Sequence, residues 1–143
     1  MKKEDMTIAE LLMEAVGIVC ALIYVGLQIY YGAVYGVSGI QIMMNVAMLI
    51  LFFAGLTLLQ IYPERVNGLT REVCSGKVRR LTVHMVGLAK LIFVVSLLFT
   101  TICDVMGHQL NSGYSLVVVV LIVVVTLIYE YRIIKILKNN VKK

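Results

Sequence analysis

Four long apolar stretches dominate this chain of 143 residues and leave few folds open to it. They cover roughly residues 8–34, 40–62, 81–106 and 114–134. At about 1.5 Å per residue, each helix would be long enough to cross about 30 Å of hydrocarbon. Because backbone groups in lipid find no water, each stretch must satisfy its own hydrogen bonds, as a helix does. We therefore predict an all-α membrane protein whose four transmembrane helices pack as an antiparallel bundle.

Composition supports a membrane location for the whole chain. Hydrophobic residues make up 61% of it and charged residues 15%. A soluble domain is about half apolar and about a quarter charged, and this excess of apolar side chains would give it large exposed patches. We interpret residues 1–143 as a single transmembrane domain, with a cytoplasmic loop over 63–80 and a cytoplasmic tail over 135–143.

The basic residues predict the orientation. Of 13 Lys and Arg residues, two precede the first stretch, five lie in the loop 63–80 and five lie near the C-terminus. The two short connections around residues 36–39 and 107–113 contain none. With four spans, both termini and the loop 63–80 share one side, and the excess of positive charge places that side in the cytoplasm. We expect a multi-pass protein of the cell membrane with both termini cytoplasmic.

Ionisable residues inside the apolar stretches are few, and a charge in hydrocarbon costs roughly 2.5–3.5 kcal/mol even on lenient scales. The candidate intramembrane polar site comprises Glu10, Glu14, Lys90 and Glu130. Glu14 and Lys90 fall at similar depth in the inner leaflet, and we expect them to pair, with Glu10, His84 or Glu130 as additional partners. In the alternative interpretation, Lys90 extends to the cytoplasmic interface and the two glutamates lie among the headgroups.

Small and polar residues recur at helical spacing on the first three stretches, which predicts helix–helix contacts there. The first stripe comprises Glu10, Glu14, Gly17, Ala21, Tyr24 and Gln28. The second comprises Gln41, Asn45, Met48, Phe52 and Gly55. The third comprises Gly87, Lys90, Val94, Leu97, Thr101 and Asp104. The fourth stretch has no such stripe before Thr126 and Glu130, so we expect it to be the most exposed to lipid.

Outside the apolar stretches, we interpret the basic residues of the loop as anchors for anionic lipid headgroups on the cytoplasmic side. These anchors are Arg65, Arg71, Lys77, Arg79 and Arg80. Asp104 and His108 are two potential metal ligands, too few for a metal site. We expect no metal, no cofactor and no nucleic-acid partner.

The chain contains no recognisable catalytic motif, which favours a non-enzymatic role. We expect an accessory, immunity or sensor-type subunit that acts by binding a membrane partner or a second copy of itself. A small oligomeric transporter or channel that uses a Glu14/Lys90 charge site is the main alternative. A membrane enzyme that binds lipid or polyprenyl phosphates through the cytoplasmic arginines is a third possibility.

Overall fold

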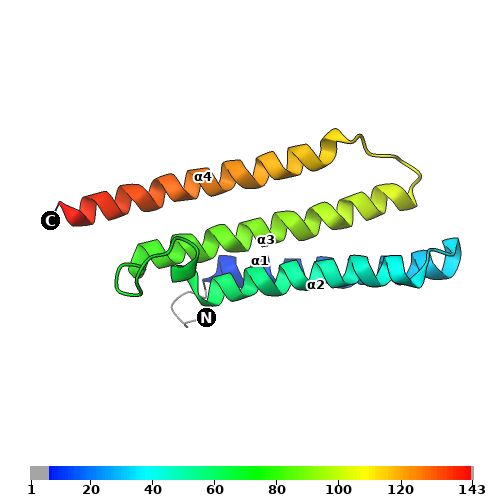
Figure 1. Cartoon of the computed structure of the whole chain (residues 1–143), viewed down its shortest axis with the longest axis horizontal. Helices are drawn as coiled ribbons and strands as arrows, with labels where there is room; N and C mark the ends of the chain where they lie inside the picture. Colours follow the sequence, from blue (N-terminus) through cyan, green and yellow to red (C-terminus); the bar gives the residue numbers. More distant parts are fainter. Residues whose placement is uncertain (1–6, 143) are drawn as a thin grey trace.

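The computed structural model describes residues 7–142, which form four long helices (Figure 1). Helix α1 covers Ile8–Tyr35, α2 covers Gly39–Ile61, α3 covers Gly76–Val105 and α4 covers Gly113–Val141; a short 3-10 helix, η2, covers Pro63–Arg65. Each long helix extends over at least about 35 Å at 1.5 Å per residue. All four are long and apolar enough to cross a membrane. The predicted all-α class and the packing of four helices are confirmed.

The ends of α1 and α2 follow local sequence signals. The side-chain oxygens of Thr7 and Ser38 each accept a hydrogen bond, at 3.3 Å, from a backbone N–H in the first turn of the helix that follows. Such caps satisfy donors that a helix start leaves free. Helix α1 ends at Tyr35 and is followed by Gly36, which has φ +63°, a conformation that glycine adopts without steric cost. The connection to α2 is therefore short and tight.

Helices α3 and α4 are longer than the apolar stretches that predicted them. Helix α3 begins at Gly76 rather than near residue 81, and α4 continues to Val141 rather than ending near residue 134. Hydropathy detects only the apolar part of a helix, whereas Lys and Arg are good helix formers that extend it into polar surroundings. Residues 76–80 of the expected loop and 135–141 of the expected tail are therefore helical.

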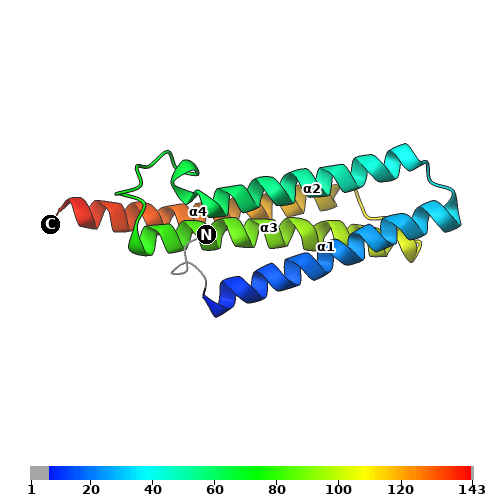
Figure 2. The ribbon, with the colours of Figure 1, turned by 90° about the horizontal axis from the view of Figure 1, so that it is seen from below.

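Helix α3 is the centre of the bundle and packs against each of the other three helices. In Figure 1, α4 lies along one side of α3, and α1 and α2 lie on the other; the view in Figure 2 shows α3 between α1 and α2. Tyr24, Leu49 and Val94 form a buried apolar cluster that joins α1, α2 and α3. Helix α3 buries nine residues, whereas α4 buries only Ile133. Most of the shared interior therefore lies where the first three helices meet.

The expected exposure of α4 is right only in part. Helix α4 packs along α3 and leaves most of its surface uncovered, as predicted. Helix α2 is almost as exposed, since it buries only Leu49 and Gln60. Both helices therefore present broad apolar faces to the outside of the bundle.

Candidate functional site

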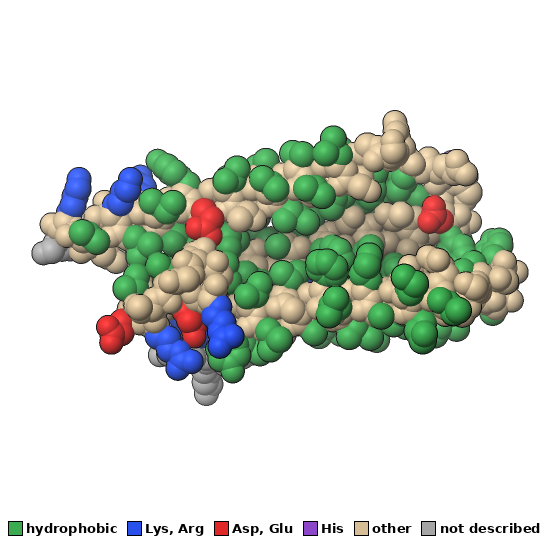
Figure 3. Space-filling model, in the orientation of Figure 1, with side chains coloured by type: hydrophobic (Ala, Val, Ile, Leu, Met, Phe, Trp, Pro, Cys, Tyr) green, Lys and Arg blue, Asp and Glu red, His purple; other side chains and the backbone are tan. Residues whose placement is uncertain are grey.

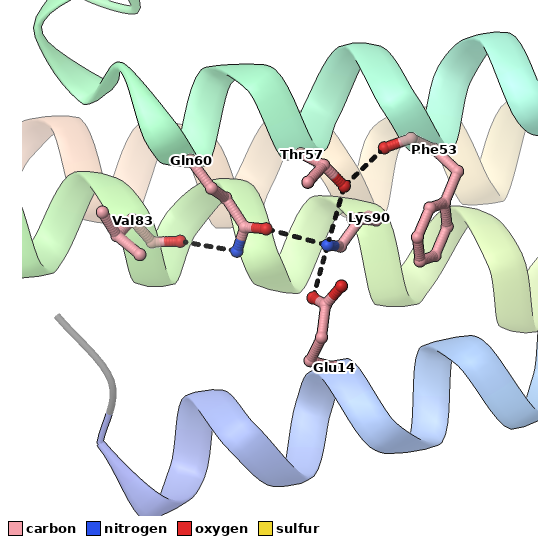
Figure 4. Close-up of polar contacts among 6 residues, drawn as sticks. All are labelled: Glu14, Phe53, Thr57, Gln60, Val83 and Lys90. Carbon is pink, nitrogen blue, oxygen red and sulfur yellow. Dashed lines mark hydrogen bonds and ion pairs between the residues drawn. The ribbon is translucent and has the colours of Figure 1, made fainter. Parts of the chain in front are cut away.

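Lys90 of α3 is buried, with 2% of its surface exposed, and points toward α1 and α2. Its Nζ atom donates hydrogen bonds to Glu14 Oε2 at 2.5 Å, to Gln60 Oε1 at 2.8 Å and to Thr57 Oγ1 at 3.3 Å (Figure 4). An ammonium group has three N–H donors and no acceptor. Each donor of Lys90 is therefore matched by an acceptor from within the chain. We call Glu14, Thr57, Gln60 and Lys90 the polar centre.

Helix α2 contributes two further features that suit a cation. The Thr57 hydroxyl donates to the carbonyl oxygen of Phe53 at 2.7 Å, which leaves its oxygen lone pairs to accept from Lys90. The Phe53 ring lies beneath the ammonium group, with its centroid 4.7 Å from Nζ. The negative face of an aromatic ring attracts a cation at this distance. These contacts lower the cost of holding Lys90 charged away from water.

Gln60 is held by both ends of its amide. Its oxygen accepts from Lys90, and its nitrogen donates to the backbone carbonyl of Val83 at 3.4 Å. With 2% of its surface exposed, the side chain has little access to other partners. The Val83 contact directs the amide oxygen toward the ammonium group, so Gln60 positions an acceptor for Lys90.

A glycine on α3 makes room for this arrangement. A Cβ atom at Gly87 would lie 2.8 Å from Gln60 Nε2, closer than real Cβ atoms approach other atoms. The same Cβ would lie 3.2 Å from Glu10 Oε2 and 3.4 Å from Met13 Cε. Gly87 therefore allows α1 and the Gln60 amide to approach α3 closely.

A second polar pair lies one helical turn closer to the start of α1. Glu10 Oε1 lies 2.5 Å from His84 Nδ1, and Glu10 has 8% of its surface exposed. The His84 ring contacts the Tyr129 ring of α4, with centroids 5.7 Å apart. This pair joins α1 to α3 and extends the contact to α4.

The structure brings together most of the expected intramembrane residues, but in two groups. Glu14 and Lys90 form the expected pair, and Lys90 does not extend to the interface as in the alternative interpretation. Glu10 pairs with His84 rather than with Lys90. Glu130 is half-buried and makes no side-chain hydrogen bond or ion pair within residues 7–142. It belongs to neither group.

The stripe predicted on α2 was wrong in part. Met48 and Gly55 are exposed, whereas Leu49, Thr57 and Gln60 face the neighbouring helices. Phe52 is exposed on one side, but its ring contacts the Phe93 ring of α3, with centroids 5.0 Å apart. The apolar sequence between Met48 and Phe52 gave no strong preference for one face. Phe53, Thr57 and Gln60 also recur at helical spacing. This spacing was the sequence signal for the face of α2 that contacts the neighbouring helices. Nearer the start of α2, Asn45 Nδ2 donates to Gln28 Oε1 at 3.0 Å, in agreement with the predicted stripes.

The loop between α2 and α3 is held partly by its own charges. Glu64 forms ion pairs with Arg71 at 3.1 Å and with Arg79 at 3.8 Å. A backbone hydrogen bond to its carboxylate, together with these arginines, holds the pKa of Glu64 below its usual range. Arg65 lies over the Tyr62 ring, 5.5 Å from its centroid, and Lys77 and Arg80 are exposed. Of the five expected lipid anchors, three therefore also make contacts within the protein.

Asp104 and His108, the two potential ligands at the other end of the bundle, are both exposed. Asp104 is exposed, unlike Gly87, Lys90 and Val94 of its predicted stripe. Within residues 7–142, no group of three or more His, Cys, Asp or Glu side chains is placed to hold a metal ion.

Comparison with known proteins gives no match. No protein-family model fits the chain, and no curated protein or solved structure matches it. The functional argument therefore rests on the polar centre and on the surfaces of the helices.

Proposed function

We propose that this chain is a multi-pass protein of the cell membrane, with both termini in the cytoplasm, and that it acts by binding a membrane partner. Four helices of sufficient length and apolarity support the membrane location. The orientation is supported by the basic side chains, which gather at the end of the molecule where α4 finishes and the loop after α2 lies (Figure 3). We call this the basic end, and the opposite end the outer end.

The observation that supports a binding role is that the polar centre makes all the hydrogen bonds of Lys90 within the protein. All three donors of Lys90 are matched by acceptors from α1 and α2, and no donor is left for a substrate. A buried charge whose hydrogen bonds are all made inside the protein can hold helices in one arrangement. In this proposal Lys90 fixes α1, α2 and α3 as a rigid unit that presents other surfaces to a partner.

Those surfaces are the outward faces of α2 and α4. On α2 the most exposed large side chains are Ile40, Met43, Met44 and Leu51. On α4 they include Leu116, Val117, Leu127 and Tyr131. Lipid covers such faces in a monomer, but close packing of a second set of helices also suits them. The partner is a membrane protein or a second copy of this chain.

The orientation is tested by labelling single cysteines in a cysteine-free background. Ser112→Cys at the outer end and Lys77→Cys at the basic end both lie at exposed positions. A membrane-impermeant maleimide added to intact cells is expected to label the first variant and to reach the second only after permeabilisation. The reverse pattern would overturn the proposed orientation.

The binding role is tested by native mass measurement of the chain extracted in mild detergent. A stoichiometric complex with a membrane protein or a second copy is expected. Leu51→Trp on α2 and Leu127→Trp on α4 serve as controls for each other. The complex should be lost only in the variant whose tryptophan lies on the face that forms the interface. If the measured mass is that of a single chain with bound lipid only, both directly from native membranes and in detergent, the proposal is wrong.

One observation favours a second candidate function, transport by a homo-oligomer. The Glu14 side chain is 31% exposed, whereas that of Lys90 is 3% exposed, so a proton or cation can approach the carboxylate from one side. Loss of proton-driven flux in Glu14→Gln would support this function. Reconstituted protein that moves no ion or dye at any pH would exclude it.

A further inference from the structure

A groove of about 600 Å³ lies between the outer halves of α3 and α4 and contains no residue of the polar centre in its lining. Its lining changes character with depth. Near the connection between the helices it is polar, with Asp104, Gln109 and Asn111. Deeper along the helices it is apolar, with Phe93 and Ile122. The twelve residues from Phe93 to Asp104 span about 16 Å of helix, so the groove is elongated along the bundle.

Most polar groups of the groove are already occupied. Thr100 donates to the carbonyl of Ser96 at 3.0 Å, and the Tyr114 hydroxyl contacts the Ser96 hydroxyl at 3.4 Å. The Asn111 side-chain oxygen accepts from Ser112 and from the Gly113 backbone. The Asp104 carboxylate and the Gln109 amide, in contrast, make no side-chain hydrogen bond or ion pair within residues 7–142. Together with the Ser115 hydroxyl, which also makes no side-chain hydrogen bond within these residues, they are available to a ligand.

The charge of the groove selects among ligands. Asp104 is the one charged residue in its lining. The connection from Met106 to Ser112 contains no Lys or Arg, and its His108 makes no ion pair with Asp104 within residues 7–142. Lys90 of the same helix points toward α1 and α2 instead. A carboxylate without a cationic neighbour attracts a cation and repels phosphate or sulfate. The apolar depth of the groove suits an alkyl chain in the membrane interior.

We propose that this groove binds a cationic amphiphile, with its ammonium group at Asp104 and Gln109 and its alkyl chain along Phe93 and Ile122. The head then lies at the outer interface, where water remains available to it, and the chain replaces lipid between the two helices. This site is independent of the polar centre and of the partner-binding faces proposed above.

The test uses the full chain in a neutral detergent, with dodecylammonium as the probe and native mass spectrometry to count bound molecules. One dodecylammonium per chain is expected to bind, and dodecyl sulfate is not expected to compete. Asp104→Asn keeps the shape of the side chain and removes its charge, so it should weaken binding about tenfold or more. Glu72→Gln removes a charge from the exposed loop and should leave binding unchanged.

A second variant tests the alkyl part of the site. Val119 is an exposed residue deeper on the α4 wall of the groove, and Val119→Trp fills space there while leaving Asp104 in place. It should weaken binding of dodecylammonium as well. If Asp104→Asn binds the probe as tightly as the unmodified chain, or if sulfate and ammonium amphiphiles bind equally, the groove accepts any alkyl chain and the proposal is wrong.

Discussion

Gly87 of α3 and Gln60 of α2 are so close that a Cβ atom at Gly87 would lie 2.8 Å from the Gln60 amide nitrogen. The same Cβ would meet Glu10 Oε2 at 3.2 Å, so both polar pairs of α1 depend on one position of α3. The carboxylate of Glu10 bonds His84, and the amide of Gln60 bonds Lys90. The absence of a side chain at Gly87 therefore permits the close packing of α1 and α2 on α3 on which both polar pairs depend.

Gly87→Ala should destabilise the bundle by roughly 1–3 kcal/mol, because Gln60 must move and its bonds to Lys90 and Val83 weaken. Thermal unfolding in detergent measures this change. Gly55→Ala on α2 is the matched control, since a Cβ there meets nothing within 4 Å. Equal melting temperatures for Gly87→Ala and Gly55→Ala would contradict the close approach.

Gln60→Leu should cost more than Thr57→Val. Gln60 accepts from Lys90 at 2.8 Å and also donates to the Val83 carbonyl, so its loss removes both hydrogen bonds. The Val83 carbonyl keeps its helical partner, but one donor of the buried ammonium group is left without an acceptor, which costs about 1–3 kcal/mol. Thr57 accepts at 3.3 Å, and its loss should cost about 1 kcal/mol. Chemical unfolding in detergent ranks the variants, with Thr126→Val on α4 as a control for loss of a threonine hydroxyl. The reverse order would show that Gln60 does not position an acceptor.

Order in the loop between α2 and α3 should depend on the charge of Glu64. The pKa of this carboxyl is lowered in the folded chain, so its ion pairs stabilise the loop above its ordinary pKa, about 4.3. That contribution is lost as the pH falls through the lower, folded-state pKa. Hydrogen exchange corrected for intrinsic rates should show faster exchange of residues 64–75 in acid, and Glu64→Gln should show it already at neutral pH. Unchanged loop protection in Glu64→Gln would contradict this role.

The amino-acid sequence predicted the number of helices and the Glu14–Lys90 pair for simple physical reasons. Apolar length determines a membrane-crossing helix, and a lysine and a glutamate at similar depth each need a partner. The orientation across a membrane stays a prediction, since it rests on the positions of Lys and Arg alone.

The α2 side of the site could not be predicted in the same way. Its apolar residues are nearly uniform around the helix, so Met48 and Leu49 look alike until the neighbours are known. The central place of α3 and the open flank beside α4 also depend on how side chains fit in three dimensions. The separation of Glu10 from Lys90 follows from His84, a partner that the sequence offered only as one of several.

The pairing of Glu14 with Lys90 predicts an asymmetry between the two partners. Glu14→Leu leaves the Lys90 ammonium, 2% exposed, without its carboxylate and should cost about 3–5 kcal/mol. Lys90→Met leaves a carboxylate that is 31% exposed and partly hydrated, and should cost less, about 1–3 kcal/mol. Glu14→Gln keeps an acceptor for Lys90 and should fall between these two variants.

The most direct test of the account is a double-mutant cycle of Glu14→Leu and Lys90→Met, with the free energy of unfolding measured in a bilayer mimic. If the two residues pair, adding Lys90→Met to Glu14→Leu removes the uncompensated ammonium, and the double variant is more stable than Glu14→Leu alone. If the two losses instead add, so that the double variant is the least stable of the three, Glu14 and Lys90 do not stabilise each other and the polar centre does not hold the helices together.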